Sequence, residues 1–81
     1  MKDLDIMTLD EANKRWYELR PIEGVRFGLN DAVCIKLGDY SGDYGSVISL
    51  ESLDPVAYVV ELPDGVDLVI AESALERADN A

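Results

Sequence analysis

The sequence contains no histidine and only one cysteine, Cys34. Histidine is the side chain that most often acts as a general base near neutral pH, so its absence argues against acid–base catalysis. A single cysteine cannot form an internal disulfide, and without histidine it cannot complete a zinc site. Cys34 alternates with Val33 and Ile35 in an expected strand, and we interpret it as an inert strand residue. We therefore expect no enzymatic activity, no cofactor and no metal site.

Basic residues are also scarce. The chain has 7 lysines and arginines against 17 acidic residues, which gives a net charge of −10. Phosphate backbones are bound by Lys and Arg, so we expect no nucleic-acid binding. The imbalance is strongest in residues 46–81, where 1 basic residue faces 8 acidic ones. Two interpretations are open: the charge only keeps the protein soluble, or an acidic face meets a basic protein partner.

Long hydrophobic runs are missing as well. The longest unbroken apolar run spans residues 56–60, far short of the roughly 20 residues that cross a membrane. The first residues, MKDLDIM, carry acids where a signal peptide has its basic region. We therefore expect a cytoplasmic protein that does not bind membranes. A chain of 81 residues forms one small domain with a thin core.

The N-terminal part has the pattern of a helix. Thr8 and Glu11 fit a capping box, and apolar residues then recur on one helical face as far as Leu19. Pro21 ends the pattern, because the residue before a proline avoids the helical region. We predict a flexible N-terminus over 1–7 and a helix over 8–20. Trp16 is expected to be buried against the rest of the domain, with Tyr17 exposed.

After the helix the apolar residues alternate with a period of two, which is typical of strands. The alternation predicts about five strands, at 25–29, 33–37, 46–50, 56–62 and 67–71. A short helical turn is expected at 72–74, and a frayed C-terminus at 78–81. The predicted core residues are Val33, Ile35, Val47, Leu50, Tyr58, Val60, Leu62, Leu68, Ile70 and Leu75.

Residues 38–45 read GDYSGDYG, with three glycines between two expected strands. Glycine is used where the backbone needs φ > 0 or a close approach, so we predict a tightly folded hairpin loop. The pattern resembles the KOW motif, the strand–loop–strand element of small SH3-like barrels in ribosomal proteins and transcription elongation factors. The matching residues are Val33, Ile35, Gly38, Gly42, Gly45, Val47 and Leu50.

The resemblance covers about residues 24–77 and implies a mainly β fold. The expected architecture is a small SH3-like (KOW-type) antiparallel barrel of about five strands with one N-terminal α-helix. Such barrels often end with a one-turn helix that leads into a last strand. Nucleic-acid-binding KOW loops usually carry Lys or Arg between their glycines, whereas this loop carries Asp39 and Asp43 and no basic residue.

Two interpretations of the loop's tyrosines are open. Tyr40 and Tyr44 either pack as lids over the open end of the barrel or contact a partner as exposed aromatic residues flanked by acids. Asp39 and Asp43 either belong to this surface or bond nearby amides as turn residues. The hypothetical partner-binding residues are Asp39, Tyr40, Ser41, Asp43 and Tyr44.

The sequence favours a non-enzymatic protein-binding module that engages a basic protein partner. One alternative is an immunity-protein or antitoxin type of inhibitor, because such proteins are often small and acidic and block basic toxin surfaces. A further alternative is a ribosome- or RNA-associated KOW domain, which the glycine pattern supports and the charge opposes.

Overall fold

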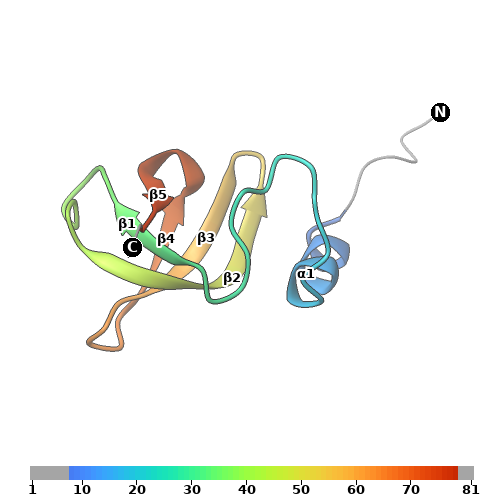
Figure 1. Cartoon of the computed structure of the whole chain (residues 1–81). Coiled ribbons are helices and arrows are strands. Elements are labelled where there is room, and N and C mark those ends of the chain that lie inside the picture. The colour runs from blue at the N-terminus through green and yellow to red at the C-terminus, as the bar shows by residue number, and fades with distance from the viewer. Residues whose placement is uncertain (1–7, 79–81) are drawn as a thin grey trace.

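The computed structural model describes residues 8–78, which form one five-stranded antiparallel sheet and one α-helix (Figure 1). The expected flexible segment 1–7 lies outside the described residues, as do 79–81 of the expected frayed end. The amide of Ala78 donates a hydrogen bond to the carbonyl of Ala32 at 2.9 Å. The elements are α1 (Leu9–Tyr17), β1 (Ala32–Ile35), β2 (Tyr44–Leu53), β3 (Val56–Glu61), β4 (Asp67–Ala71), the 3-10 helix η2 (Glu72–Ala74) and β5 (Leu75–Arg77).

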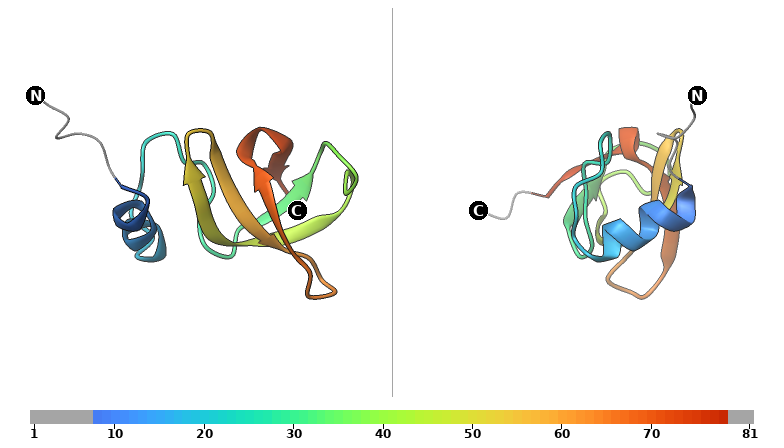
Figure 2. Two further views of the ribbon diagram at one scale, coloured as in Figure 1. Left: turned by 180° about the vertical axis from the view of Figure 1, so that it is seen from behind. Right: turned by 90° about the vertical axis from the view of Figure 1, so that its right-hand side faces the viewer.

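The strand order in the sheet is β4-β3-β2-β1-β5. The first four strands follow one another as a meander, and β5 returns to pair with β1 after the turn of η2. The long strand β2 runs from one end of the sheet to the other, and the sheet curls around it (Figures 1 and 2). Within residues 8–78 no backbone pairing joins the edge strands β4 and β5, so the sheet is not closed into a barrel. The prediction of a mainly β fold with one helix is confirmed.

The side chains on the inner face of the curled sheet form the core. Val69 on the outer face is 62% exposed, whereas its neighbours Leu68 and Ile70 pack against the core and are partly buried. The predicted register is therefore correct, because a slip by one residue would exchange the two faces. Leu68 and Ile70 are less buried than expected because β4 is an edge strand. The buried predicted residues are Val33, Ile35, Val47, Leu50, Tyr58, Val60, Leu62 and Leu75.

The predicted strand at 25–29 is wrong: this segment has no strand structure. Its alternation does reflect burial, since Phe27 is only 2% exposed. The amides of Arg26, Phe27 and Gly28, however, are bonded by side chains rather than by a neighbouring strand. The amides of Arg26 and Phe27 donate to the hydroxyl of Tyr58 at 3.2 and 3.1 Å, and the amide of Gly28 donates to Asp31 Oδ2 at 2.8 Å.

The start of α1 confirms the predicted capping box. The Thr8 hydroxyl accepts from the amide of Glu11, and the Glu11 carboxylate accepts from the amide of Thr8, both at 3.1 Å. These two bonds satisfy amides that the first turn of a helix leaves without a partner. Of the predicted apolar stripe, Ala12 and Trp16 are buried, whereas Leu9 at its start is 39% exposed.

The helix ends at Tyr17, three residues before the predicted end. Leu19 adopts a φ of 60°, in the left-handed region, and is 72% exposed rather than part of the buried stripe. The amide of Leu19 donates to the carbonyl of Trp16, and the amide of Arg20 donates to that of Arg15. This pair of bonds is a Schellman motif, which closes a helix end and usually has glycine where this chain has Leu19.

The helix lies at one end of the sheet, against β2 (Figure 1). Tyr17 is 49% exposed, as predicted, but its hydroxyl also donates to the carbonyl of Ile48 at 3.1 Å. Asn13 Nδ2 donates to the carbonyl of Leu50 at 3.0 Å. The pairing of β2 with β3 shifts register between Val47 and Ser49, so Ile48 lies in a bulge there. The helix therefore bonds backbone groups at an irregular part of the strand.

Candidate functional site

The predicted site residues lie at the end of the molecule that is opposite to α1. The loop between β1 and β2 and the hairpin between β3 and β4 both reach this end (Figure 1). Strand β2 begins here at Tyr44, next to β3, which ends at Glu61. Loop 36–43 and hairpin 62–66 are thus held by neighbouring strands of one sheet.

Backbone hydrogen bonds fold the loop tightly. The amide of Gly42 donates to the carbonyl of Ile35 at 2.7 Å, and the amide of Ile35 donates to the carbonyl of Asp43 at 2.8 Å. The Ser41 hydroxyl donates to the carbonyl of Lys36 at 2.9 Å. Ser41, predicted as a contact residue, therefore has its hydroxyl donor engaged within the loop.

The three glycines meet two different requirements. Gly38 and Gly42 have φ values of 90° and 96°, which L side chains rarely adopt. Gly45 is needed for a close approach instead, since a Cβ there would lie 2.7 Å from both the Glu61 carbonyl oxygen and Val60 Cγ1. Gly45 therefore lets β3 lie close against the start of β2.

The tyrosines of the loop face solvent. Tyr40 is 43% exposed and Tyr44 is 59% exposed, so neither is a lid over the core. The carboxylates of Asp39 and Asp43 are also exposed and accept no hydrogen bond from any residue of the described part of the chain. The turn amides bond backbone carbonyls, as the amide of Asp43 does with Tyr40 at 2.9 Å. The alternative in which both aspartates bond nearby amides is therefore not supported.

The pairing of the strands determines the direction of Tyr44. Its Cα partner is Cys34 on β1, and its inner-face neighbour is Gly45, which pairs with the buried Val33. Tyr44 therefore points to the outer face, as does Ser46 two residues later. Ser46 pairs with Glu61 on β3, so Glu61 also belongs to this face.

Two shallow hollows flank Tyr44. The first has a volume of about 420 Å³ and the second about 370 Å³, and they share Tyr44, Leu62 and Pro63. The first is further lined by Gly45, Ser46, Glu61 and Gly65, and the second by Gly42, Asp43 and Asp64. We call them the Glu61 hollow and the Asp43 hollow.

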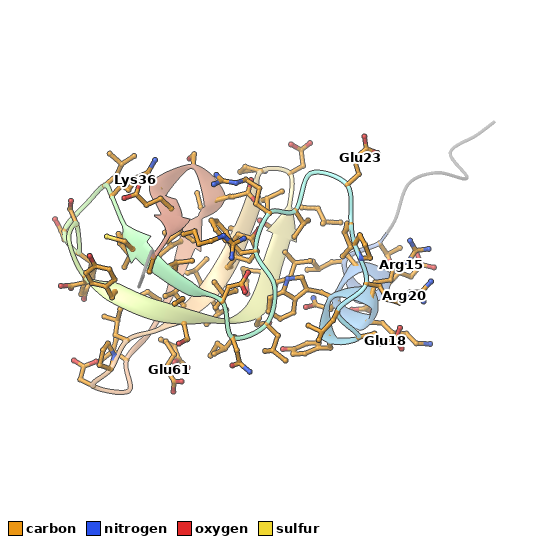
Figure 3. All side chains as sticks on the ribbon, in the orientation of Figure 1. Arg15, Glu18, Arg20, Glu23, Lys36 and Glu61 are labelled. Carbon is orange, nitrogen blue, oxygen red and sulfur yellow. The ribbon has the colours of Figure 1, made fainter. Side chains whose placement is uncertain are left out.

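The surroundings of both hollows are acidic. Each is lined by at least one carboxylate and by no lysine or arginine. Glu61 is also the direct cross-strand partner of Asp67, which places two carboxylates side by side on the outer face. Figure 3 shows Lys36 pointing away from the side that bears Glu61, and Arg15 and Arg20 at the helix end. The negative charge at the hollows is thus not balanced by neighbouring bases.

Reasoning from sequence missed the part that the β3–β4 hairpin contributes. It predicted strands at 56–62 and 67–71, but it did not connect Glu61 with the loop at 38–45. The sequence does contain a sign of this contact. A turn at Asp54-Pro55 joins β2 and β3 as a hairpin, so the end of β3 lies beside the start of β2. The two register shifts between β2 and β3 then select Glu61 as the partner of Ser46.

Tyr58 is fully buried, and its hydroxyl group has a structural role. The hydroxyl of Tyr58 accepts hydrogen bonds from two backbone amides and donates one to Glu72 Oε2 at 2.5 Å. Burial, and next the bond to the Glu72 carboxylate, raise the pKa of Tyr58 well above its usual range. This network ties the segment after the helix to the turn between β4 and β5.

No three His, Cys, Asp or Glu side chains among the described residues lie together as metal ligands. Cys34 is partly buried and free. Within residues 8–78 no helix is both long enough and apolar enough to cross a bilayer.

A comparison of the chain with protein-family models, curated proteins and solved structures found no match. The resemblance to the KOW motif is therefore carried by the residues of the motif alone.

Proposed function

We propose that the protein is a non-enzymatic protein-binding module whose loop 38–45 engages a basic protein partner. The observation that carries the proposal is the exposure of Tyr40 and Tyr44 on a hydrogen-bonded loop that has acidic and no basic residues. Exposed tyrosines provide large contact areas and are enriched in interfaces. Asp39 and Asp43 favour a partner of opposite charge.

The tight folding of the loop supports this function. Binding costs conformational entropy when a loop must become ordered, and a loop that is already ordered avoids much of that cost. Gly42 and Ser41 bond to β1 and its C-terminal continuation, at Ile35 and Lys36. Tyr44 is itself the first residue of β2. These contacts hold the backbone at both tyrosines in a defined position.

We also propose that the domain is related in architecture to the SH3-like barrels that carry KOW motifs. Support comes from the meander of β1 to β4, the single turn of η2 and the return of β5 beside β1. Loop 36–43 occupies the position between β1 and β2 that the motif predicts. A solved structure in which β4 and β5 are far apart would contradict the barrel.

The two alternative functions make different predictions. An inhibitor of the immunity-protein type would form a stable complex with one basic toxin. An RNA-associated KOW domain would bind RNA in a salt-sensitive way, as tested by gel shift at low ionic strength. The acidic loop favours a protein partner over RNA, because Asp39 and Asp43 repel phosphates.

The direct test is affinity capture from the source cell with mass spectrometry. The wild-type protein and a Tyr40→Ala/Tyr44→Ala variant serve as parallel baits, with thermal melts to verify that both are folded. We expect a basic protein that the wild type captures and the folded variant does not. A partner retained equally by both baits would contradict the proposal, as would RNA-dependent capture.

A second variant distinguishes long-range electrostatic attraction of the partner from direct contact in the complex. Asp39→Asn with Asp43→Asn should mainly slow association with the captured partner and flatten its salt dependence, because charges at an interface rim guide the encounter. Tyr44→Ala should mainly speed dissociation. Binding kinetics at several salt concentrations measure both effects, and salt-independent association of the wild type would argue against a basic partner.

A further inference from the structure

We infer that the two hollows beside Tyr44 each receive one basic side chain from a single extended segment of the partner, which crosses the Tyr44 ring between them. This inference rests on the proposed function and specifies its binding mode. The ligand is a pair of lysine or arginine side chains in one peptide segment. The receiving residues come from the β1–β2 loop and the β3–β4 hairpin.

The shape of the surface supports two subsites rather than one. Tyr44, Leu62 and Pro63 line both hollows and so separate them, while the remaining residues differ. The Tyr44 side chain is 59% exposed and stands on the outer face of the sheet. An aromatic ring attracts lysine and arginine side chains at its face, and a ring between two hollows can be contacted from both.

The charges support a cation in each hollow. The Asp43 hollow has the carboxylates of Asp43 and Asp64, and the Glu61 hollow has that of Glu61, close to Asp67. Among residues 8–78 no lysine or arginine lines either space. A basic ligand is therefore favoured at both, and an acidic or phosphorylated one is repelled.

The pair formed by Glu61 and Asp67 also favours a basic ligand at the Glu61 hollow. Like charges directly opposite each other on neighbouring strands destabilise a sheet. Neither carboxylate has an ion-pair partner among the described residues. A cation in the Glu61 hollow would relieve this repulsion. Binding there therefore compensates for a local conflict that folding leaves in place.

A metal ion fits this surface less well than a basic side chain. Within the described part of the chain no three carboxylates converge in the way that several carboxylates do at a typical protein calcium site. The shared wall of the hollows is made by an aromatic, an aliphatic and a proline residue. Such a wall suits the aliphatic stem and charged head of lysine or arginine.

The test uses short peptides on the intact protein. The probes are acetyl-GRGRG-amide, acetyl-GRGGRG-amide and acetyl-GRGGGRG-amide, which vary the spacing between two arginines. The controls are acetyl-GRGGGG-amide with one arginine and the same peptides with neutral citrulline. Amide chemical shifts of the protein, followed by NMR at low ionic strength, give both affinity and location.

We expect one spacing to bind at least about tenfold more tightly than the single-arginine peptide, since the second contact becomes intramolecular. Shifts should concentrate in residues 42–46 and 61–66, and the citrulline peptides should not bind. Shifts spread over all acidic positions, or no gain from the second arginine, would overturn the inference.

Four variants assign the effect to named side chains. Tyr44→Ala should weaken the best probe by at least about tenfold, whereas Tyr44→Phe, which keeps the ring, should bind nearly as well. Glu61→Gln should weaken binding and raise the melting temperature, because the repulsion from Asp67 is removed. Glu51→Gln removes one charge from an exposed position of β2 outside both hollows, and it should leave binding nearly unchanged.

The results separate this inference from the proposed function. A captured partner that needs Tyr40 and Tyr44 but binds the folded Glu61→Gln and Asp43→Asn variants unchanged would retain the proposed function and overturn the two-cation mode. If no partner depends on the tyrosines, the proposed function itself is wrong. Equal weakening by Glu51→Gln and Glu61→Gln would show only general attraction and would also overturn the inference.

Discussion

The indole Nε1 of Trp16 donates a hydrogen bond to the carbonyl oxygen of Phe27 at 2.7 Å, and both side chains are almost fully buried. This bond joins the helix to the segment that leads into the sheet. A helix of 9 residues is marginal by itself in water, so its stability depends on such contacts. Trp16 is thus the main attachment of α1 to the domain.

We predict that Trp16→Phe lowers the free energy of unfolding by about 2–4 kcal/mol. The change leaves the buried carbonyl of Phe27 without its donor and removes part of a buried ring. Tyr17→Phe is the matched control, because it removes a hydroxyl bond that is exposed to solvent, and it should cost no more than about 1 kcal/mol. Urea unfolding measures both. Equal losses would show that the indole bond does not hold the helix.

The network around Tyr58 predicts a loss of stability in alkali. Because burial raises its pKa in the folded protein, the unfolded chain loses the Tyr58 proton above a pH of about 10 while the folded protein retains it. The free energy of unfolding should then fall by about 1.4 kcal/mol per pH unit from this group. Below that pH the stabilising contribution is fully present.

Tyr58→Phe isolates this effect. The variant should be less stable near neutral pH, because the buried amide of Phe27 loses its acceptor, whereas the amide of Arg26 keeps its bond to Glu72 Oε2. Its difference from the wild type should shrink as the pH rises above about 10. The measurement is the free energy of unfolding of both proteins across this pH range. A constant difference between the wild type and the variant would rule out a raised pKa of Tyr58.

The left-handed conformation of Leu19 is strained in a way that glycine would relieve. We predict that Leu19→Gly stabilises the protein by about 1 kcal/mol, because a residue with a Cβ is disfavoured at this φ. Leu19→Ala retains the Cβ and should give no gain. Thermal melts compare the two, and a loss of stability in the glycine variant would mean that the exposed leucine side chain contributes packing.

The glycines of the loop should respond to substitution in different ways. Gly45→Ala should destabilise by about 1–3 kcal/mol, because its Cβ would collide with the backbone of Glu61. Gly42→Ala meets no neighbouring atom and should cost only the strain of its φ, about 1 kcal/mol. Chemical unfolding ranks them. A larger loss at Gly42 would contradict the close approach of β3 to Gly45.

Much of the fold could be predicted from the sequence because alternation reports burial directly. The outer position of Val69 and the inner position of Ile35 follow from it. The prediction of a strand at 25–29 is wrong for the same reason. Alternation indicates which side chains are buried, but it does not indicate which groups accept hydrogen bonds from the backbone amides. The hydroxyl of Tyr58 replaces a neighbouring strand there, and no local pattern indicates so distant a partner.

The site could be predicted only in part. Its glycines and tyrosines are contiguous in sequence, so Tyr44 was identified as a candidate residue. The contribution of Glu61 depends on two bulges in β2. Without them Ser46 would lie opposite Pro63, because each shift moves the pairing by one residue. Bulges arise from packing across the whole sheet, and a single strand does not reveal them.

The most direct test of the central claim is the affinity of the captured partner for Tyr44→Ala compared with Tyr17→Ala. Both tyrosines are about half exposed, at 59% and 49%, but Tyr17 lies on the helix at the opposite end. We predict a loss of roughly 30-fold for Tyr44→Ala, as for a hot-spot residue, and almost none for Tyr17→Ala, with both variants folded. Unchanged affinity for a folded Tyr44→Ala would contradict the account.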